Sequence, residues 1–265
     1  MLAISSASRI VLSPHLDDAA LSLGGSIVRW TVAGERILIV TVAAGSPSPG
    51  AALSAFAESL HRAWGVGSVD VVALRRREDE AAMGILGAEA HRLERLDAVY
   101  RLPQRYDTEA ALLGEPALED RLGLDLALDL AAILDASPRA AILAPLAVGG
   151  HVDHRVVHHV AVELSRRGRE VCFYEDFPYA ARPLAVEERR AAIGVELEPV
   201  TLDIAATLDR KVAAVLAYES QIDALFGGIE AARAAILAYA QEVGQGSPAE
   251  RTWRATGAGS SVNSS

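Results

Sequence analysis

Two short segments place histidine and carboxylate side chains three residues apart, where a strand is expected to end and a helix to begin. In "VLSPHLDDAALSLGG", His15 and Asp18 have this spacing, and in "APLAVGGHVDHRVVHH", His151 and His154 have it. At the first turn of a helix, residues three apart lie on one face. Two imidazole nitrogens and one carboxylate oxygen, with a water as the fourth ligand, are typical of a catalytic zinc site. Three of these groups could therefore meet around one ion.

Each of these side chains also has a simpler interpretation. An aspartate at a helix start, such as Asp17 or Asp18, is often only an N-cap. Capping explains the adjacent pair less well, because a second carboxylate adds repulsion. A lone histidine is more often structural, and no metal role is assigned to His61, His91, His158 and His159. The same arrangement after two separate strands nevertheless favours a metal site over coincidence.

Strand-like and helix-like segments alternate along the chain. We expect strands at 9–13, 36–45, 68–74, 139–146 and 170–177, and helices at 18–33, 52–65, 77–90, 119–136 and 153–167. This alternation predicts an α/β fold, with a mainly parallel sheet and helices on both faces. Such sheets bind ligands beyond the carboxyl ends of their strands. Both histidine-containing segments should therefore lie at the same edge of the sheet.

The remaining segments are expected to belong to the same unit. Residues 103–118 are predicted to form a surface excursion, and residues 185–245 a helical appendix. No linker separates two domains, so we expect a single domain over residues 1–255. The Gly/Ser-rich residues 256–265 are predicted to form a flexible tail.

Composition excludes several classes of partner. The net charge of −10 over 265 residues argues against nucleic acid as the main ligand, because nucleic-acid binding depends on phosphate neutralisation by Lys and Arg. No apolar stretch approaches the ~18 residues of a membrane span, and no signal peptide is evident, so we expect a cytoplasmic protein without membrane partners. Cys172 is the only cysteine, which excludes an internal disulfide and a cysteine-based zinc cluster. Homo-oligomer formation is left open.

The segments "PHLDD…LSLGG" and "HVDH" together resemble the PIG-L/LmbE-type zinc-dependent N-deacetylases. The first family motif is usually (A/S)HPDD, and here Leu16 stands between the histidine and the aspartates. The resemblance extends through "FAESLHRAWG", "RRREDEAAMGILG", "YEDFPYA" and "KVAAVLAYESQ". It implies a Rossmann-like fold. No dinucleotide is implied, because the first strand–helix turn lacks GxGxxG.

The resemblance also implies a role for each clustered residue. His15, Asp18 and His154 would bind Zn²⁺, which lowers the pKa of water and polarises a carbonyl. Asp17 would be the general base that activates a water for attack on an amide carbonyl. His151 would stabilise the oxyanion or protonate the leaving amine. Asp153 would hold His151 in position, and a carboxylate beside this imidazole would keep it cationic.

Further positions of the resemblance concern the substrate. Arg75 and Glu78 match an Arg-x-x-Glu pattern that contacts substrate in the family, although a solvated, charged helix start explains them equally well. Some relatives from thiol-cofactor pathways carry a tyrosine where this chain has Gly149. This departure argues against that branch of the family.

We therefore expect a zinc-dependent hydrolase that removes an N-acyl group, with acetyl as the expected one, from an amino sugar. The substrate would be a small glycoside or a glycosylated metabolite such as an antibiotic intermediate, and the sequence does not choose among such compounds. One alternative is an amidase that cleaves a thiol-sugar conjugate. Another is a metal-binding or sugar-binding protein without turnover, against which the free carboxylate of Asp17 argues.

Overall fold

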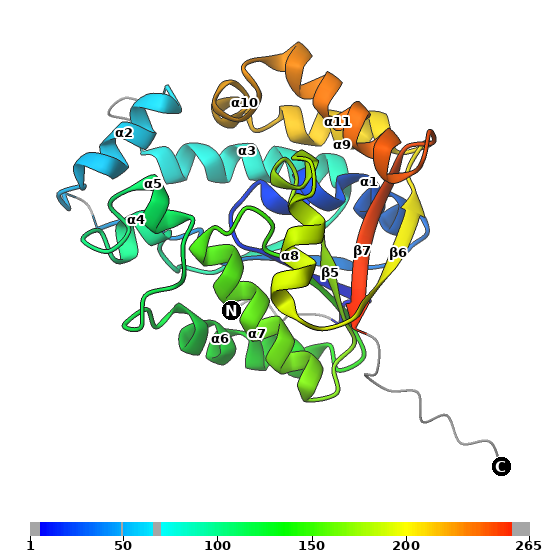
Figure 1. Ribbon diagram of the computed structural model, residues 1–265, viewed down its shortest axis with the longest axis horizontal. Helices are drawn as coiled ribbons and strands as arrows, with labels where there is room; N and C mark the ends of the chain where they lie inside the picture. Colours follow the sequence, from blue (N-terminus) through cyan, green and yellow to red (C-terminus); the bar gives the residue numbers. More distant parts are fainter. Residues whose placement is uncertain (1–5, 49, 66–69, 256–265) are drawn as a thin grey trace.

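A seven-stranded sheet forms the centre of the protein. The computed structural model describes residues 6–48, 50–65 and 70–255 (Figure 1). The strands are β1 (Arg9–Ser13), β2 (Ile37–Thr41), β3 (Glu89–Arg92), β4 (Ala141–Pro145), β5 (Val171–Tyr174), β6 (Leu197–Asp203) and β7 (Ala249–Ala255). Their order is β3-β2-β1-β4-β5-β7-β6. The strands from β3 to β5 are parallel, whereas β7 is antiparallel to both β5 and β6.

This architecture confirms the predicted fold class. The order of the five parallel strands is that of the Rossmann fold, so the sheet is Rossmann-like and mainly parallel. β1 and β4 are neighbours, with Arg9 opposite Ala141 and Val11 opposite Leu143. Both strands are almost entirely buried, as apolar strands of a sheet covered on both faces must be. The residues that follow β1 and β4 consequently reach the same carboxyl edge.

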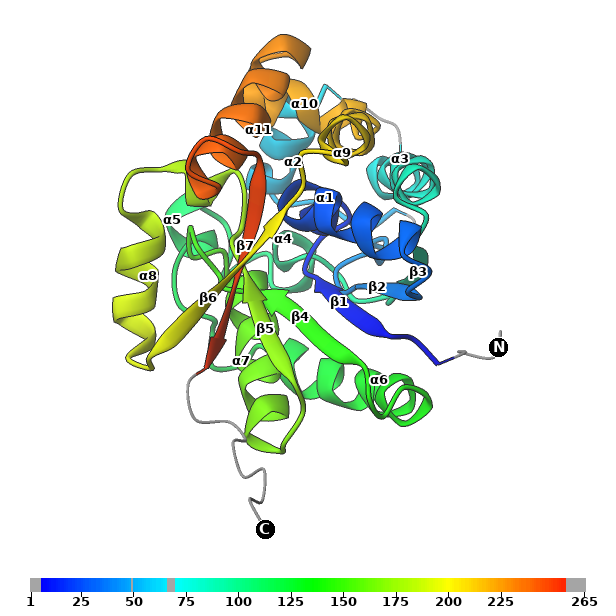
Figure 2. The same ribbon diagram turned by 90° about the vertical axis from the view of Figure 1, so that its right-hand side faces the viewer.

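Helices cover both faces of this sheet. They are α1 (Asp18–Val32), α2 (Ala55–Ala63), α3 (Val71–Leu86), α4 (Ala98–Arg101), α5 (Glu109–Leu112), α6 (Leu122–Ala136), α7 (Val152–Arg166), α8 (Ala185–Ile193), α9 (Leu208–Leu216), α10 (Glu219–Phe226) and α11 (Ile229–Val243), with a 3₁₀ helix, η1 (Tyr179–Ala181). Figure 2 shows α1, α3, α9 and α11 on one side and α6 and α7 on the other. Each side buries its own apolar cluster. None of the helices in the described residues could cross a bilayer.

Around residue 70, the strand predicted at 68–74 is wrong, and the helix predicted at 77–90 has different bounds. The strand expected at 68–74 is the start of α3, whose N-cap is Asp70, with a side chain that accepts the Ala73 N–H at 3.1 Å. Residues 68 and 69 lie outside the described residues. The β-branched residues of this segment favoured a strand, but the cap and the charged residues that follow favour a helix. The helix expected at 77–90 ends at Leu86, and its last part leads into the polar edge strand β3.

The C-terminal part contains two strands that were not predicted. The helical appendix expected at 185–245 includes β6, which pairs along its whole length with β7. Both strands carry several polar residues, and β6 is largely exposed, so neither has the periodicity of a half-buried strand. Part of the surface excursion predicted at 103–118 is helical, as α5. The predicted tail, 256–265, lies outside the described residues.

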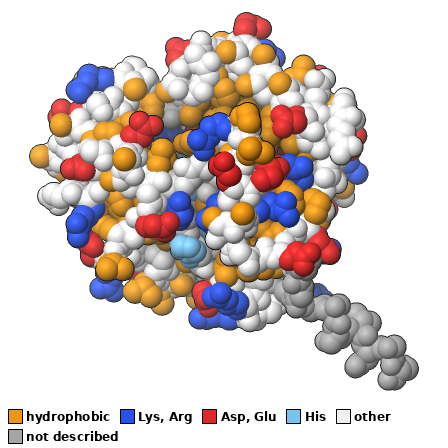
Figure 3. Space-filling model, viewed as in Figure 1, with side chains coloured by type: hydrophobic (Ala, Val, Ile, Leu, Met, Phe, Trp, Pro, Cys, Tyr) orange, Lys and Arg blue, Asp and Glu red, His pale blue; other side chains and the backbone are white. Residues whose placement is uncertain are grey.

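Charged side chains are mixed on the surface. On the face in Figure 3, Lys and Arg side chains are interspersed with Asp and Glu side chains and do not gather into one broad basic patch. Nucleic-acid binding usually requires such a patch, because it neutralises several phosphates at once.

Candidate active site

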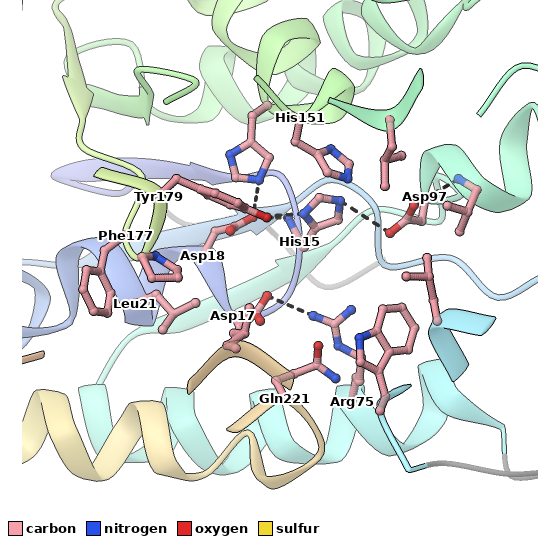
Figure 4. A pocket seen from close by; sticks show the side chains of 17 residues that line it. His15, Asp17, Asp18, Leu21, Arg75, Asp97, His151, Phe177, Tyr179 and Gln221 are labelled. Atoms are coloured by element: carbon pink, nitrogen blue, oxygen red, sulfur yellow. Dashed lines mark hydrogen bonds and ion pairs between the residues drawn. The ribbon is translucent and has the colours of Figure 1, made fainter. Parts of the chain in front are cut away.

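The two predicted segments meet in one cavity at the carboxyl edge of the sheet (Figure 4). One segment reaches it where β1 leads into α1, and the other where β4 leads into α7. The cavity has a volume of about 200 Å³. The residues that line it are His15, Asp17, Asp18, Leu21, Leu60, Trp64, Arg75, Asp97, Val99, Leu112, His151, His154, Phe177, Pro178, Tyr179, Gln221 and Leu225. Of the six residues to which the sequence analysis assigned a metal or catalytic role, only Asp153 does not line the cavity.

His15, Asp18 and His154 bring three potential metal-ligand atoms together. Oδ2 of Asp18 lies 3.2 Å from Nδ1 of His15 and 3.3 Å from Nε2 of His154. The ligand atoms of the three residues all lie within 4.8 Å of one another. All three side chains are buried. Two imidazoles and one carboxylate are a donor set that zinc accepts, with a position left for water.

The outer nitrogen of each of these imidazoles meets a carboxylate. Nε2 of His15 lies 3.2 Å from Oδ2 of Asp153, and Nδ1 of His154 lies 2.6 Å from Oδ1 of Asp176. With an ion bound among His15, Asp18 and His154, the ring protons would lie on these outer nitrogens, because a carboxylate can only accept. The lone pairs of Nδ1 of His15 and Nε2 of His154 would then be free to bind the ion. Carboxylates behind the ligand histidines are typical of metal sites, so these residues fit a divalent ion.

The charges around the cluster also favour a cation. Burial alone would lower the pKa of His154, but the charges of Asp18 and Asp176 outweigh it and raise the pKa to about 10. For His15, Asp153 and Asp18 likewise outweigh burial and raise the pKa well above its ordinary value. The carboxylates thus create a negative potential at this point. Either protons on the imidazoles or a divalent ion can neutralise it.

The side chain of Asp153 does not hold His151, contrary to our expectation. Asp153 is fully buried, and its carboxylate contacts Nε2 of His15, accepts from the Arg101 guanidinium at 2.6 Å and accepts the Ala98 N–H at 3.1 Å. Burial alone would raise its pKa, but Arg101 and the hydrogen bond with His15 outweigh burial and lower it. Asp153 therefore positions a ligand candidate of the metal.

His151 is held by the backbone. It is the N-cap of α7, and its Nδ1 accepts the N–H of Asp153 at 3.2 Å. The proton of the neutral ring is then on Nε2, which makes this nitrogen a donor. Burial, followed by the charge of His15, lowers the pKa of His151 well below its ordinary value. The expectation of a cationic His151 is therefore wrong for the structure as described.

A second group of potential ligands comprises His15, Asp97, His151 and Asp153. The hydrogen bonds of the group argue against an ion there. Nε2 of His15 already donates a proton to Asp153, and the lone pair of Nδ1 of His151 already accepts a backbone N–H. Asp153 is in addition bound by Arg101. The His15–Asp18–His154 group is the better candidate.

Asp17 is placed beside the candidate ligands without being one of them. It is the N-cap residue of α1, yet its side chain makes no capping hydrogen bond. Instead Oδ1 of Asp17 accepts from the Arg75 guanidinium at 2.9 Å (Figure 4). Arg75 also lies against the Trp64 ring, and its buried Nε has no hydrogen-bond partner among the described residues. The cavity thus contains one aspartate that is engaged neither in capping nor in the ligand group.

The two predicted substrate contacts have different surroundings. Arg75 lines the cavity, as expected, whereas Glu78 does not. Glu78 is buried on α3, and its carboxylate accepts the N–H of Ser220 at 2.8 Å and the hydroxyl of Ser220 at 2.7 Å. It therefore fixes the start of α10, the helix that carries Gln221 into the cavity. The expectation that Glu78 contacts substrate directly does not fit this geometry.

Several cavity or supporting residues were not found from the sequence. Asp97 caps α4, and its Oδ2 lies 3.4 Å from Nε2 of His15. Asp176 follows β5, the strand beside β4. It could have been found because polar residues that follow parallel strands gather at the carboxyl edge of the sheet. Tyr179 and Gln221 line the cavity from "YEDFPYA" and "KVAAVLAYESQ", segments of the family resemblance in which no role was assigned to either residue. Only the fold brings these four residues to the site.

Comparisons with known proteins agree with this geometry. The family profile described as "PIG-L: GlcNAc-PI de-N-acetylase" matches residues 10–165. A 2'-N-acetylparomamine deacetylase from Streptomyces fradiae is 36% identical over 228 residues, which cover 81% of this chain and 73% of that protein. The match to the profile includes every predicted residue of the two segments.

Solved structures extend the similarity beyond residue 165. The A40926 pseudoaglycone deacetylase Dbv21 superposes with a TM-score of 0.76 at 28% identity, over 96% of this chain and 100% of that one. The zinc inhibited form of teicoplanin deacetylase Orf2 gives a TM-score of 0.76 at 26% identity, over 94% and 97% of the two chains. The C-terminal helices and strands are thus part of the shared fold. The chain belongs to the PIG-L family, and it is an N-deacetylase that acts on amino sugars.

Proposed function

We propose that this chain removes the acetyl group from a 2-acetamido sugar of a small, cationic aminoglycoside, with Zn²⁺ held by His15, Asp18 and His154. The observation that carries this proposal is the convergence of three ligand atoms beside Asp17, a carboxylate outside the ligand group. When bound, zinc lowers the pKa of water and polarises a carbonyl. The chain's own residues account for the remaining steps.

Asp17 is the proposed general base. Its carboxylate lies at the cavity wall and takes a proton from the attacking water, whose oxygen bonds to the amide carbon. The hydrogen bond from Arg75 to Oδ1 holds Asp17 in place at the cavity wall and leaves its other oxygen available for the proton. As the C–N bond breaks, Asp17 passes the proton that it took from the water to the departing nitrogen. The Nε2–H of His151 donates a hydrogen bond to that nitrogen and keeps its proton. Acetic acid and a free amine are released.

The net charge of the chain supports a cationic substrate. Zn²⁺ together with Arg75 would balance the charges of Asp17, Asp18 and Asp97 in the cavity, so the attraction comes from the rest of the protein. The whole chain carries a net charge of −10. An aminoglycoside, with several protonated amines, is attracted by this field, whereas a phosphate-bearing glycolipid is repelled. The paromamine deacetylase of S. fradiae is similar over most of both chains, which also supports this substrate class.

A glycopeptide is the second candidate substrate. It is favoured by the similarity to the A40926 pseudoaglycone deacetylase, which covers that entire chain. The cavity volume of about 200 Å³ is smaller than the usual 300–1,000 Å³ of ligand pockets, so a glycopeptide would have to place most of its mass outside. An aminoglycoside is smaller than a glycopeptide and would leave less of its mass outside.

The test is amine release from a panel of N-acetylated compounds. Protein stripped with a chelator and then reconstituted with zinc is assayed with 2'-N-acetylparomamine, an N-acetylglucosaminyl glycoside, N-acetylglucosaminyl phosphatidylinositol and a glycopeptide pseudoaglycone. We expect the highest kcat/KM for the aminoglycoside and no turnover before zinc is restored. Preference for the glycopeptide would select the second candidate. Full activity of the stripped protein would contradict the metal proposal.

A further inference from the structure

The hydroxyl of Tyr179 differs from that of every other tyrosine in the chain. The other five donate or accept in hydrogen bonds: Tyr100 with His61, Tyr106 with Asp120, Tyr174 with the Leu12 carbonyl, Tyr218 with Asp79 and Tyr239 with Glu175. Among the described residues, no hydrogen bond is made by the Tyr179 hydroxyl. Tyr179 also lines the cavity, where a substrate atom can supply the missing partner. The residue is half-buried, and its hydroxyl is free to donate to a ligand in the cavity.

The surroundings of Tyr179 hold its ring beside the candidate metal ligands. It is the first residue of η1, in the connection between β5 and α8. Its ring stands edge-on to the ring of His154, with 6.4 Å between centroids. Figure 4 shows the ring extending toward the side chains of Asp18 and His15. The phenol is thus directed at the point where the reacting amide must lie.

Gly149 leaves the space that this ring occupies. A Cβ atom on Gly149 would lie 2.5 Å from Cγ of Tyr179, closer than any real Cβ contact. Gly149 also has a φ of 87°, a conformation that side chains disfavour. The loop before α7 therefore accommodates the tyrosine by presenting bare backbone. Any side chain at position 149 would displace the ring from the cavity wall.

We propose that the Tyr179 hydroxyl donates a hydrogen bond to the acetyl oxygen as this oxygen becomes negatively charged, which makes Tyr179 a catalytic residue. The inference rests on the proposed deacetylation. Water addition moves the carbonyl π electrons onto the oxygen, and the phenol stabilises that charge without giving up its proton. A phenol is suited to this role, since its ordinary pKa of about 10 keeps it protonated at neutral pH.

Tyr179 and His151 can act at the same time. The ring of His151 contacts both His15 and His154, with 4.7 and 5.5 Å between ring centroids, whereas that of Tyr179 contacts His154 at 6.4 Å. The two donors come from different segments, His151 from the start of α7 and Tyr179 from η1. One donor is then available for the oxygen and the other for the departing nitrogen. This division removes the need for His151 to serve both atoms.

The first test is Tyr179→Phe, which deletes only the unpartnered oxygen, with Tyr100→Phe as the matched control outside the cavity. Loss of one oxyanion donor costs about 10²–10³-fold in kcat. We expect that loss for Tyr179→Phe, with KM, zinc content and melting temperature unchanged, and no effect for Tyr100→Phe. Affinity for a tetrahedral methylphosphonamidate analogue of the acetamido sugar should fall in parallel with kcat. Unchanged kcat and analogue affinity would overturn the role of Tyr179.

The second test uses Gly149→Ala in two backgrounds. In the wild-type chain, the added methyl should displace the ring and lower kcat as strongly as Tyr179→Phe. In a Tyr179→Ala chain, which has no ring to displace, Gly149→Ala should lower kcat much less than in the wild-type chain, because only the strained φ of 87° remains. Additive losses would show that Gly149 acts independently and would contradict the proposed arrangement. If the wild-type enzyme deacetylates none of the panel compounds, the proposed function itself fails, which is a separate outcome.

Discussion

Asp153→Asn is the substitution that best separates the observed site from the one expected from sequence. In the structure, the Asp153 carboxylate binds Nε2 of His15, so its loss should weaken metal binding. Had the carboxylate held His151 instead, the substitution would have affected turnover and left the metal in place. The two interpretations therefore predict changes in different measurements.

The expected magnitude follows from the contacts of Asp153. Removing a carboxylate that orients a ligand histidine typically lowers metal affinity 10–100-fold, or about 1.4–2.7 kcal/mol. Breaking a buried ion pair costs about 3–5 kcal/mol of folding stability. We expect the lower end of that range, because Arg101 keeps Asp120 at 2.8 Å and the asparagine oxygen can still accept the Ala98 N–H.

Zinc affinity is measured by competition with a chromogenic chelator, and kcat is then measured at saturating zinc. Asp120→Asn is the matched control, because it removes the other carboxylate of Arg101 but does not touch His15. We expect a 10–100-fold loss of affinity for Asp153→Asn only, with kcat largely restored by excess zinc. Wild-type zinc affinity in a folded Asp153→Asn protein, together with an altered pH–rate profile, would refute this reasoning. It would show that Asp153 positions His151 instead.

Three further substitutions test other parts of the site and fold. Asp17→Asn should keep zinc and lose about 10²–10⁴-fold in kcat, whereas zinc loss would show that Asp17 is a ligand. Glu78→Ala should raise KM more than it lowers kcat, because freeing Ser220 loosens the helix that carries Gln221; an unchanged KM would separate that helix from substrate binding. Burial lowers the pKa of His158 to about 4, so on acidification the unfolded chain binds a proton near pH 6.5, whereas the folded chain binds it only near pH 4. Stability should fall by about 3 kcal/mol between pH 6.5 and 4, and His158→Gln should flatten that slope in chemical denaturation.

The ligand candidates could be predicted because local spacing and strand ends determine them. His15 lies in the turn before α1 and its backbone N–H donates to Asp18, the first residue of the helix, while His154 joins them because β1 and β4 are adjacent in a parallel sheet. Both features leave a signature in the sequence. The spacing of three residues between polar side chains at each helix start, together with the alternation of strands and helices, was enough to predict that three side chains meet.

The supporting contacts could not be predicted, because they join segments that are distant in sequence. Asp153 lies two residues from His151, yet its carboxylate turns toward His15, 138 positions away. Sequence proximity gave the wrong partner because His151 is an N-cap and its side chain folds back onto the backbone of α7. Tyr179 lies in "YEDFPYA", a segment of the resemblance in which the tyrosine was given no role, and its place depends on the glycine of another loop.

The C-terminal part of the chain, whose two strands had no clear pattern, positions a third strand end at the site. Glu175, next to Asp176, is buried and accepts hydrogen bonds from Arg251 at 2.6 Å and Trp253 at 2.8 Å, both on β7. Its other oxygen accepts the hydroxyl of Tyr239 on α11 at 2.5 Å. These bonds fix the segment after β5 that supplies both the acid behind His154 and the phenol in the cavity. The ends of β1 and β4 thus carry the ligand candidates, and β7 and α11 hold the neighbouring end of β5 against them.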